Sequence, residues 1–151
     1  MFGGNTNAAH PVALVLAVLL ALAWTVTLVV WDVREQRLPN ALTLPAAAAA
    51  VVACFVYPTG WWGMLWPGMY LVTALATPVN RPGIGGGDIK LAVPLGVAVA
   101  LSGGVMGVLG AMLLSSMITV CVLLVARQSG MAHGPSMLTA AWLVVIACAL
   151  T

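Results

Sequence analysis

Three acidic residues are the main candidates for chemistry in this chain of 151 residues, which contains no other Asp or Glu. Asp32 follows the apolar run 12–31, Glu35 comes shortly after it, and Asp88 lies just before a second apolar run. An ionisable side chain in or beside a membrane segment is energetically expensive, so it is a functional candidate by default. Two carboxylates brought together can share one proton, with one acting as base and the other as acid. Such a pair could activate water against a peptide carbonyl; alternatively, the acids are solvated loop residues that balance nearby arginines.

The composition indicates where these acids act. Hydrophobic residues make up 63% of the chain and charged residues only 5%, whereas soluble domains carry about a quarter charged residues. This excludes a soluble enzyme, a disordered protein and a nucleic-acid binder, and the net charge of +2 gives no electrostatic reason to expect an acidic partner. The chain is therefore predicted to be an integral membrane protein, with residues 1–151 forming a single membrane-embedded domain.

Apolar runs predict an all-α fold of six transmembrane helices. The stretch 89–126 is too long for one crossing, and the sequence Ser102-Gly103-Gly104 is a natural break because paired glycines interrupt helices. Dividing the stretch there leaves a short fourth helix. The predicted spans are 12–31, 41–57, 61–79, 89–101, 105–126 and 136–151.

The basic residues predict the orientation of these spans. All of them fall after the first, third and fifth span: Arg34, Arg37, Arg81, Lys90 and Arg127. With six spans these three loops share one side, which the positive-inside rule makes cytoplasmic. Both termini then lie on the non-cytoplasmic side of the inner (plasma) membrane, and both candidate acids lie at its cytoplasmic face. An aromatic belt is expected at the opposite interface, formed by Tyr57, Trp61, Trp62 and Trp66.

The residues after Asp32 predict a short, defined turn. Pro39 disfavours helix at the residue before it and prevents the first span from continuing. Asn40 is a candidate N-cap for the second span. This turn would fix Asp32 relative to its neighbours.

Glycines precede Asp88. Gly85 and Gly87 belong to a stretch with four glycines in five positions, 83–87, and glycine permits the close approach of another backbone. An open backbone of this kind would let an extended peptide lie against the acid, whereas the alternative is simply a flexible loop. Lys90 follows closely; it could stabilise the ionised acid pair or a developing oxyanion, or it could be an interfacial lysine whose ammonium reaches the membrane surface.

Together these segments resemble the type IV prepilin peptidases, a family of GxGD membrane aspartic proteases. Residues 32–40 resemble their first block, 83–91 resemble the GxGD block with its following Lys-Leu, and His133-Gly134-Pro135 resembles a third, Gly-Pro block. The resemblance implies that Asp32 and Asp88 are the catalytic pair.

The resemblance also implies an activity and its partners. Enzymes of this family remove the basic leader from prepilins or pseudopilins, just before the substrate's hydrophobic helix, so a pilin precursor and the lipid bilayer are the expected partners. Larger relatives also methylate the new N-terminus through a domain with paired CxxC motifs. This sequence has no CxxC motif, so we expect peptidase activity alone, as in the short enzymes of tight-adherence (Flp-type) pilus systems.

No cofactor or metal ion is expected, because two carboxylates alone make a poor cation site. The alternative function is a non-enzymatic membrane subunit, either a small transporter or an assembly component of a pilus or secretion system. Paired acids also serve in proton relays, but that reading predicts acids deep within the spans. An inactive family member is a third reading, although both aspartates are present. Nothing in the sequence indicates an oligomeric state.

Overall fold

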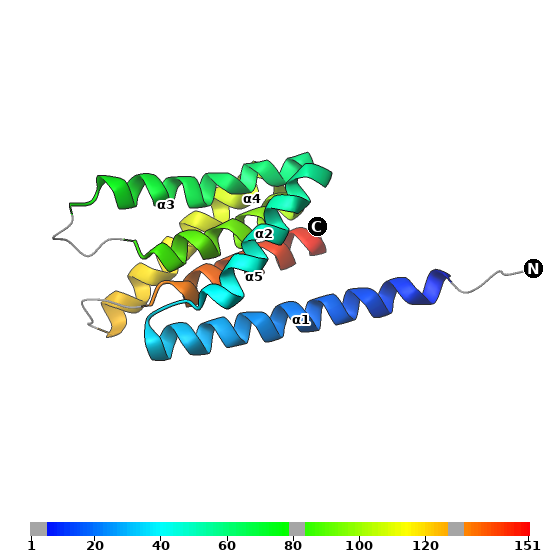
Figure 1. Ribbon diagram of the computed structural model, residues 1–151, viewed down its shortest axis with the longest axis horizontal. Coiled ribbons are helices and arrows are strands. Elements are labelled where there is room, and N and C mark those ends of the chain that lie inside the picture. The colour runs from blue at the N-terminus through cyan, green and yellow to red at the C-terminus, as the bar shows by residue number, and fades with distance from the viewer. Residues whose placement is uncertain (1–5, 79–83, 127–131) are drawn as a thin grey trace, which may run out of the picture.

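A computed structural model describes residues 6–78, 84–126 and 132–151, and every regular element within these ranges is a helix. The predicted all-α class is therefore confirmed, while Arg81, Gly83 and Arg127 lie outside the described residues. Figure 1 shows the elements, which are α1 (Thr6–Glu35), α2 (Asn40–Val56), the 3-10 helix η1 (Pro58–Met64), α3 (Leu65–Ala76), α4 (Gly86–Ala126) and α5 (Gly134–Leu150).

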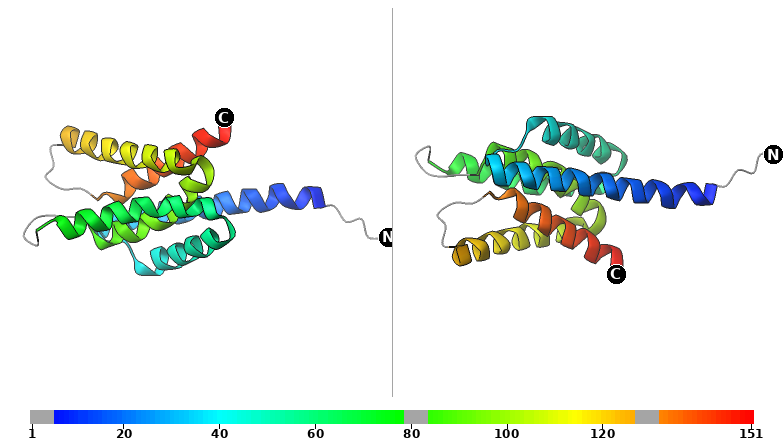
Figure 2. Two further views of the ribbon diagram at one scale, coloured as in Figure 1. Left: turned by 90° about the horizontal axis from the view of Figure 1, so that it is seen from above. Right: turned by 90° about the horizontal axis from the view of Figure 1, so that it is seen from below.

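The long element α4 is a helical hairpin rather than one rod. Gly104 has φ 58° and ψ −154°, a backbone conformation that is essentially restricted to glycine. The chain reverses at this residue, and the second half of α4 runs back beside the first (Figure 2). Val99 and Val108, one from each half, are both completely buried. The break predicted at residues 102–104 is thus confirmed.

The expectation of a short fourth helix is wrong. Helix α4 begins at Gly86 and stays helical up to the break, so its first half covers 86–103 instead of 89–101. Glycine is most unfavourable in a helix interior, whereas Gly86 and Gly87 occupy the first two positions of α4. The irregular segment is the predicted third span, which starts as η1 and whose α-helical part, α3, has only 12 residues.

Two segments are apolar and long enough to cross a membrane, Pro11–Glu35 and Gly86–Val125, and α2 and α5 are shorter apolar helices. Large apolar side chains face outward along these helices. Leu20, for example, is 71% exposed and Val125 is 86% exposed. Such a surface suits lipid rather than water, because soluble monomers rarely expose large continuous apolar patches.

The order of the helices brings distant segments to one end of the bundle. The end of α1, the start of α2, the end of α3, both ends of α4 and the start of α5 all lie at the same end (Figure 1). The start of α1 and the end of α5 point toward the other end. We call the first of these the Asp32 end, because Asp32 lies in the last turn of α1.

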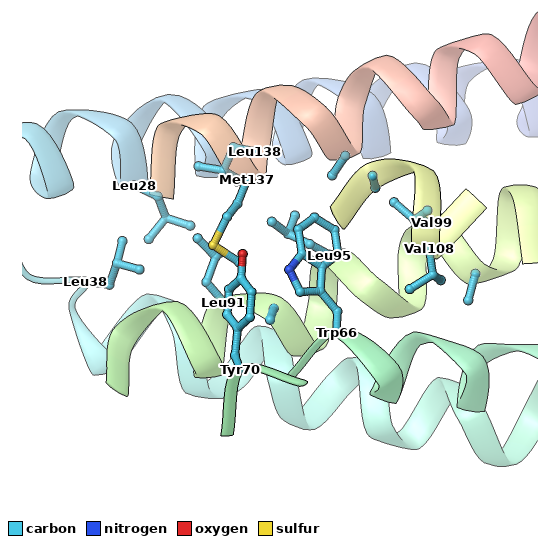
Figure 3. Close-up of a cluster of buried hydrophobic side chains, with 14 residues drawn as sticks. Leu28, Leu38, Trp66, Tyr70, Leu91, Leu95, Val99, Val108, Met137 and Leu138 are labelled. Carbon is cyan, nitrogen blue, oxygen red and sulfur yellow. The ribbon is translucent and has the colours of Figure 1, made fainter. Parts of the chain in front are cut away.

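The core lies between α3, the first half of α4 and α5. Trp66 and Tyr70 extend from α3 into a cluster with Leu91 of α4 and Met137 of α5 (Figure 3). Trp66 is completely buried and meets Tyr70 edge to face, with ring centroids 6.4 Å apart. Its predicted place in an aromatic belt is therefore wrong, because it lies on the inner face of α3.

The other predicted belt residues are exposed. Tyr57, Trp61 and Trp62 all lie at the turn between α2 and α3. Beside them, η1 packs tightly on α4, where Gly63 and Gly96 face each other backbone to backbone. A Cβ on either glycine would overlap the main chain of the other. Small residues allow membrane helices this close approach.

Candidate active site

Asp32 is one of the few buried polar residues among those described, with only 5% of its surface exposed. Its Oδ2 accepts a hydrogen bond of 3.0 Å from the backbone N–H of Gly134, the first residue of α5. A donated N–H at a helix N-terminus stabilises negative charge on the carboxylate. A Cβ on Gly134 would overlap this carboxylate, so the contact requires glycine.

The end of α1 is shaped locally. The N–H of Gln36 donates to the carbonyl of Asp32 at 3.0 Å, and Gln36 itself has φ 49°, the left-handed conformation that commonly ends a helix. Helix α1 therefore stops at Glu35, before Pro39 is reached. Asp32 is thereby fixed in the final turn of the helix.

Two tryptophan hydrogen bonds hold α1 against its neighbours. The indole N–H of Trp24 donates to the carbonyl of Leu42 in α2 at 3.1 Å. The indole N–H of Trp142 in α5 donates to the hydroxyl of Thr25 at 3.0 Å. These bonds connect α1 to both helices that flank the Asp32 end.

Asp88 is the third residue of α4 and is half-buried. Its backbone N–H donates to the carbonyl of Gly85 at 3.0 Å, which begins the helix. A carboxylate in the first turn of a helix is favoured by the helix dipole. Asp88 lies at the Asp32 end, because the start of α4 and the end of α1 are at the same end of the bundle (Figure 1). Two acids that are 56 residues apart in the sequence are thus brought to one end of the bundle.

The glycines before Asp88 differ in their surroundings: Gly85 and Gly86 are exposed, whereas Gly87 is packed. Gly86 and Gly87 are in the first turn of α4. A Cβ on Gly87 would lie 3.2 Å from the Cβ of Leu38, and one on Gly85 would lie 3.5 Å from Oδ2 of Asp88. Gly87 therefore allows the start of α4 to approach the link that follows Asp32.

Pro39 and Asn40 join this arrangement from α2. Pro39 occupies the N-cap position, and its carbonyl accepts from the N–H of Thr43 at 3.1 Å. The N-cap predicted for Asn40 is wrong because its side chain is used elsewhere: its Oδ1 accepts from Nζ of Lys90 at 2.9 Å. Lys90 lies two residues after Asp88, and residues at that spacing do not share a helix face. Its observed contact links α4 to α2.

His133, at the N-cap of α5, was not selected as a site residue from the sequence, although its Gly-Pro turn was noted. Its Nε2 lies 2.7 Å from the hydroxyl of Tyr70, and its Nδ1 lies 2.8 Å from the hydroxyl of Thr119. Burial lowers the pKa of the His133 imidazole below its ordinary value of 6.5. In the sequence, His133 is marked only by the Gly-Pro pair that follows it. The structure shows why the glycine is needed, since Gly134 lies against the Asp32 carboxylate.

A metal centre has no support within 6–78, 84–126 and 132–151, where no group of three His, Cys, Asp or Glu side chains could hold an ion. Cys54 is buried, Cys121 is exposed and Cys148 is partly exposed, and all three are free thiols. The Asp32 end thus brings together the carboxylates of Asp32 and Asp88, the imidazole of His133 and the ammonium of Lys90.

The apolar helices and the acids grouped at one end define a helical membrane protein with a candidate active site at the end of its bundle. The chain belongs to the type IV leader peptidase family, whose model matches residues 19–125. It is therefore a protein of the leader peptidase type. The matched region contains both Asp32 and Asp88 and ends before the Gly-Pro turn. Neither the search of curated proteins nor that of solved structures returned a match.

Proposed function

We propose that this protein is an aspartic endopeptidase that removes the basic leader from type IV prepilins or pseudopilins, with Asp32 and Asp88 as its catalytic pair. The observation that carries the proposal is that the fold brings these two acids, one from α1 and one from α4, to the same end of the bundle. Membership of the leader peptidase family supports the reaction class. The third acid, Glu35, is exposed and has no role in the proposal.

In the proposed reaction the two acids hold one proton and one water molecule between them. The ionised carboxylate takes a proton from water as the water oxygen attacks the scissile carbonyl carbon. The protonated carboxyl donates its proton to the carbonyl oxygen, and a proton then passes to the leaving amine as the C–N bond breaks. The N–H of Gly134 holds the Asp32 carboxylate in place through these steps. The pair titrates as a unit rather than as two separate groups.

The proposed topology has six crossings, formed by α1, α2, η1 with α3, the two halves of α4, and α5. The reversal at Gly104 supports two crossings within α4, since 18 and 22 helical residues, from 86–103 and 105–126, reach about 27 and 33 Å. Arg34, Arg37 and Lys90 at the Asp32 end support a cytoplasmic location for this end, so the basic leader of a prepilin would meet the acids there. Both termini then lie outside the cytoplasm.

This placement supports the proposed substrate class. A prepilin of the Flp type has a basic leader followed by a hydrophobic helix, so its cleavage site lies at the membrane surface. The proposed acid pair lies at the same depth, at the ends of apolar helices. The 151 residues contain no CxxC motif, so the proposed reaction is cleavage without methylation of the new N-terminus.

Cleavage of a Flp-type prepilin in membranes tests the proposal. The parent chain is co-expressed with the prepilin, beside Asp32→Asn, Asp88→Asn and the matched control Glu35→Gln, with the amount of each protein checked. We expect the parent and Glu35→Gln to remove the leader, and both aspartate variants to leave the precursor intact. Mass spectrometry of the mature N-terminus is expected to show no methyl group.

Leader removal by either aspartate variant would contradict the acid pair. Loss of cleavage in Glu35→Gln as well would show that a general effect of charge, rather than this pair, controls the reaction. Failure of the parent on a panel of Flp-type prepilins would favour the non-enzymatic membrane subunit.

A further inference from the structure

His133 occupies the junction of three helices at the Asp32 end. It precedes α5, and both nitrogens of its ring are engaged by other elements. Tyr70 of α3 contacts Nε2 at 2.7 Å, and Thr119 of the second half of α4 contacts Nδ1 at 2.8 Å. One side chain thus connects α3, α4 and α5 beside the candidate catalytic pair.

The partners of His133 are themselves held in place. Tyr70 is 9% exposed, and its ring lies 5.8 Å from the imidazole, centroid to centroid. The hydroxyl of Thr119 donates to the carbonyl of Ser115 at 3.0 Å and lies 2.6 Å from the hydroxyl of Ser136. Ser136 is buried and donates to the carbonyl of His133 at 2.7 Å. The imidazole and its own carbonyl are therefore both restrained by a polar network.

The hydrogen-bond roles in this network suit a neutral imidazole. When Nδ1 carries the ring proton, it donates to the Thr119 oxygen, and the Thr119 hydroxyl proton remains available for the oxygen of Ser136 or the carbonyl of Ser115. Nε2 is then the acceptor for the hydroxyl proton of Tyr70. A neutral ring has one donor and one acceptor, so both of its nitrogens are satisfied.

The peptide bond between His133 and Gly134 carries this restraint to Asp32. The Gly134 N–H that donates to Asp32 belongs to the same peptide plane as the His133 carbonyl. That carbonyl also accepts from the N–H of Met137 at 3.2 Å, in the first turn of α5. Gly134 has no side chain to hold its amide, so the direction of the N–H is set by His133 on one side and by α5 on the other.

The network reaches Asp32 through the Gly134 amide, and the His133 imidazole itself makes no hydrogen bond to that carboxylate. A small displacement of the imidazole would move the Gly134 amide relative to Asp32. Misplacement of a catalytic group by about 1 Å can cost about a hundredfold in rate.

We propose that His133 is a positioning residue that, through Tyr70 and Thr119, aims the Gly134 amide at the Asp32 carboxylate. The proposal rests on the proposed acid pair for its effect on catalysis, but the positioning itself is a property of the structure that can be measured without substrate. His133 neither transfers a proton to substrate nor contacts it. Its positioning role rests on its contacts with Tyr70 of α3 and Thr119 of α4.

Nuclear magnetic resonance of the full chain in detergent micelles, labelled with 15N at its 16 glycines, tests the positioning step. The Gly134 signal is assigned by its loss in Gly134→Ala. We expect Tyr70→Phe, Thr119→Val and His133→Gln each to shift this signal and to raise the hydrogen-exchange rate of the amide about tenfold or more. Thr139→Val is the matched control, because the Thr139 hydroxyl bonds only within α5, to the carbonyl of Pro135.

Cleavage kinetics in lipid nanodiscs, with a purified Flp-type prepilin, test the catalytic consequence. We expect Tyr70→Phe and Thr119→Val to lower kcat about tenfold with KM within about twofold, and Thr139→Val to keep both values. In a His133→Gln background, Tyr70→Phe is expected to add little, because the two residues act through the same contact.

Three outcomes overturn the inference. The first is a Gly134 amide unchanged by all three network variants. The second is a change in KM alone, and the third is a fall in rate that only follows the folded fraction. Asp32→Asn is assayed in parallel, so that a failure of the proposed catalytic pair can be distinguished from a failure of the proposed positioning role. An active Asp32→Asn variant contradicts the acid pair, whereas an inactive one beside fully active network variants contradicts only the positioning role.

Discussion

The backbone N–H of Gly134 donates to Oδ2 of Asp32 across 3.0 Å, although the two residues are 102 positions apart in the sequence. This single bond joins the last turn of α1 to the first turn of α5. It satisfies one oxygen of a buried carboxylate, and an unpaired buried carboxylate would be costly. It also explains why a glycine stands at the start of α5, since no side chain fits between the two helices there.

We expect Gly134→Ala to reduce cleavage by about a hundredfold or more, because its Cβ would displace the Asp32 carboxylate. The measurement is kcat for leader removal, per folded enzyme, by purified protein in nanodiscs. Pro135→Ala, at the next position but with Pro135 only partly buried, controls for general damage to the start of α5. Full activity in Gly134→Ala would show that the contact has no part in catalysis.

Adjacent glycines at the start of α4 give a second, internally controlled prediction. A Cβ on Gly87 would press on Leu38 at 3.2 Å, whereas one on Gly86 would meet nothing within 4 Å. Gly87→Ala is therefore expected to lower the rate of cleavage severalfold with expression retained, while Gly86→Ala keeps the parent rate. Membrane cleavage assays with protein amounts matched by immunoblot test the pair, and equal rates in the two variants would contradict the prediction.

Stability of the bundle depends on the contact between η1 and α4. Gly96→Ala places a Cβ into the backbone of Gly63, so we expect destabilisation of about 1–3 kcal/mol, typical of overpacking. Gly110→Ala, also in α4, meets no atom within 4 Å and should leave the stability unchanged or slightly raised. Apparent melting temperatures in detergent measure both effects. A Gly96→Ala variant as stable as the parent would show that the two segments can separate without cost.

Stability should also depend on pH through His133. Burial lowers the pKa of this imidazole below 6.5 in the folded protein. Below that pH the unfolded chain binds more protons at His133 than the folded protein does, so stability falls as the pH falls. Between about pH 7.5 and about pH 5.5 we therefore expect acidification to lower the apparent melting temperature of the parent relative to that of His133→Gln. An equal drop in both proteins would assign the effect to other groups.

Much of the fold could be predicted from the sequence because lipid imposes simple rules. A chain with 5% charged residues has to satisfy its backbone in helices if it lies in a bilayer. Paired glycines after Ser102 indicated the reversal at Gly104, since only glycine readily adopts that backbone conformation. The predicted length of the fourth helix failed because Gly86 and Gly87 were interpreted as loop, although the first turn of a helix accepts them.

The sequence alone determined which groups could do chemistry. Acidic side chains are costly to place in a membrane and are therefore rare in an apolar chain, and Asp32 and Asp88 are two of the three present. Only the tertiary structure decided what surrounds them. Trp66 looked like an interfacial residue and is core, and His133 looked unimportant and connects three helices. Local sequence encodes helix starts, ends and apolar faces, but the partner of a buried carboxylate depends on how distant helices pack, and no local pattern records that geometry.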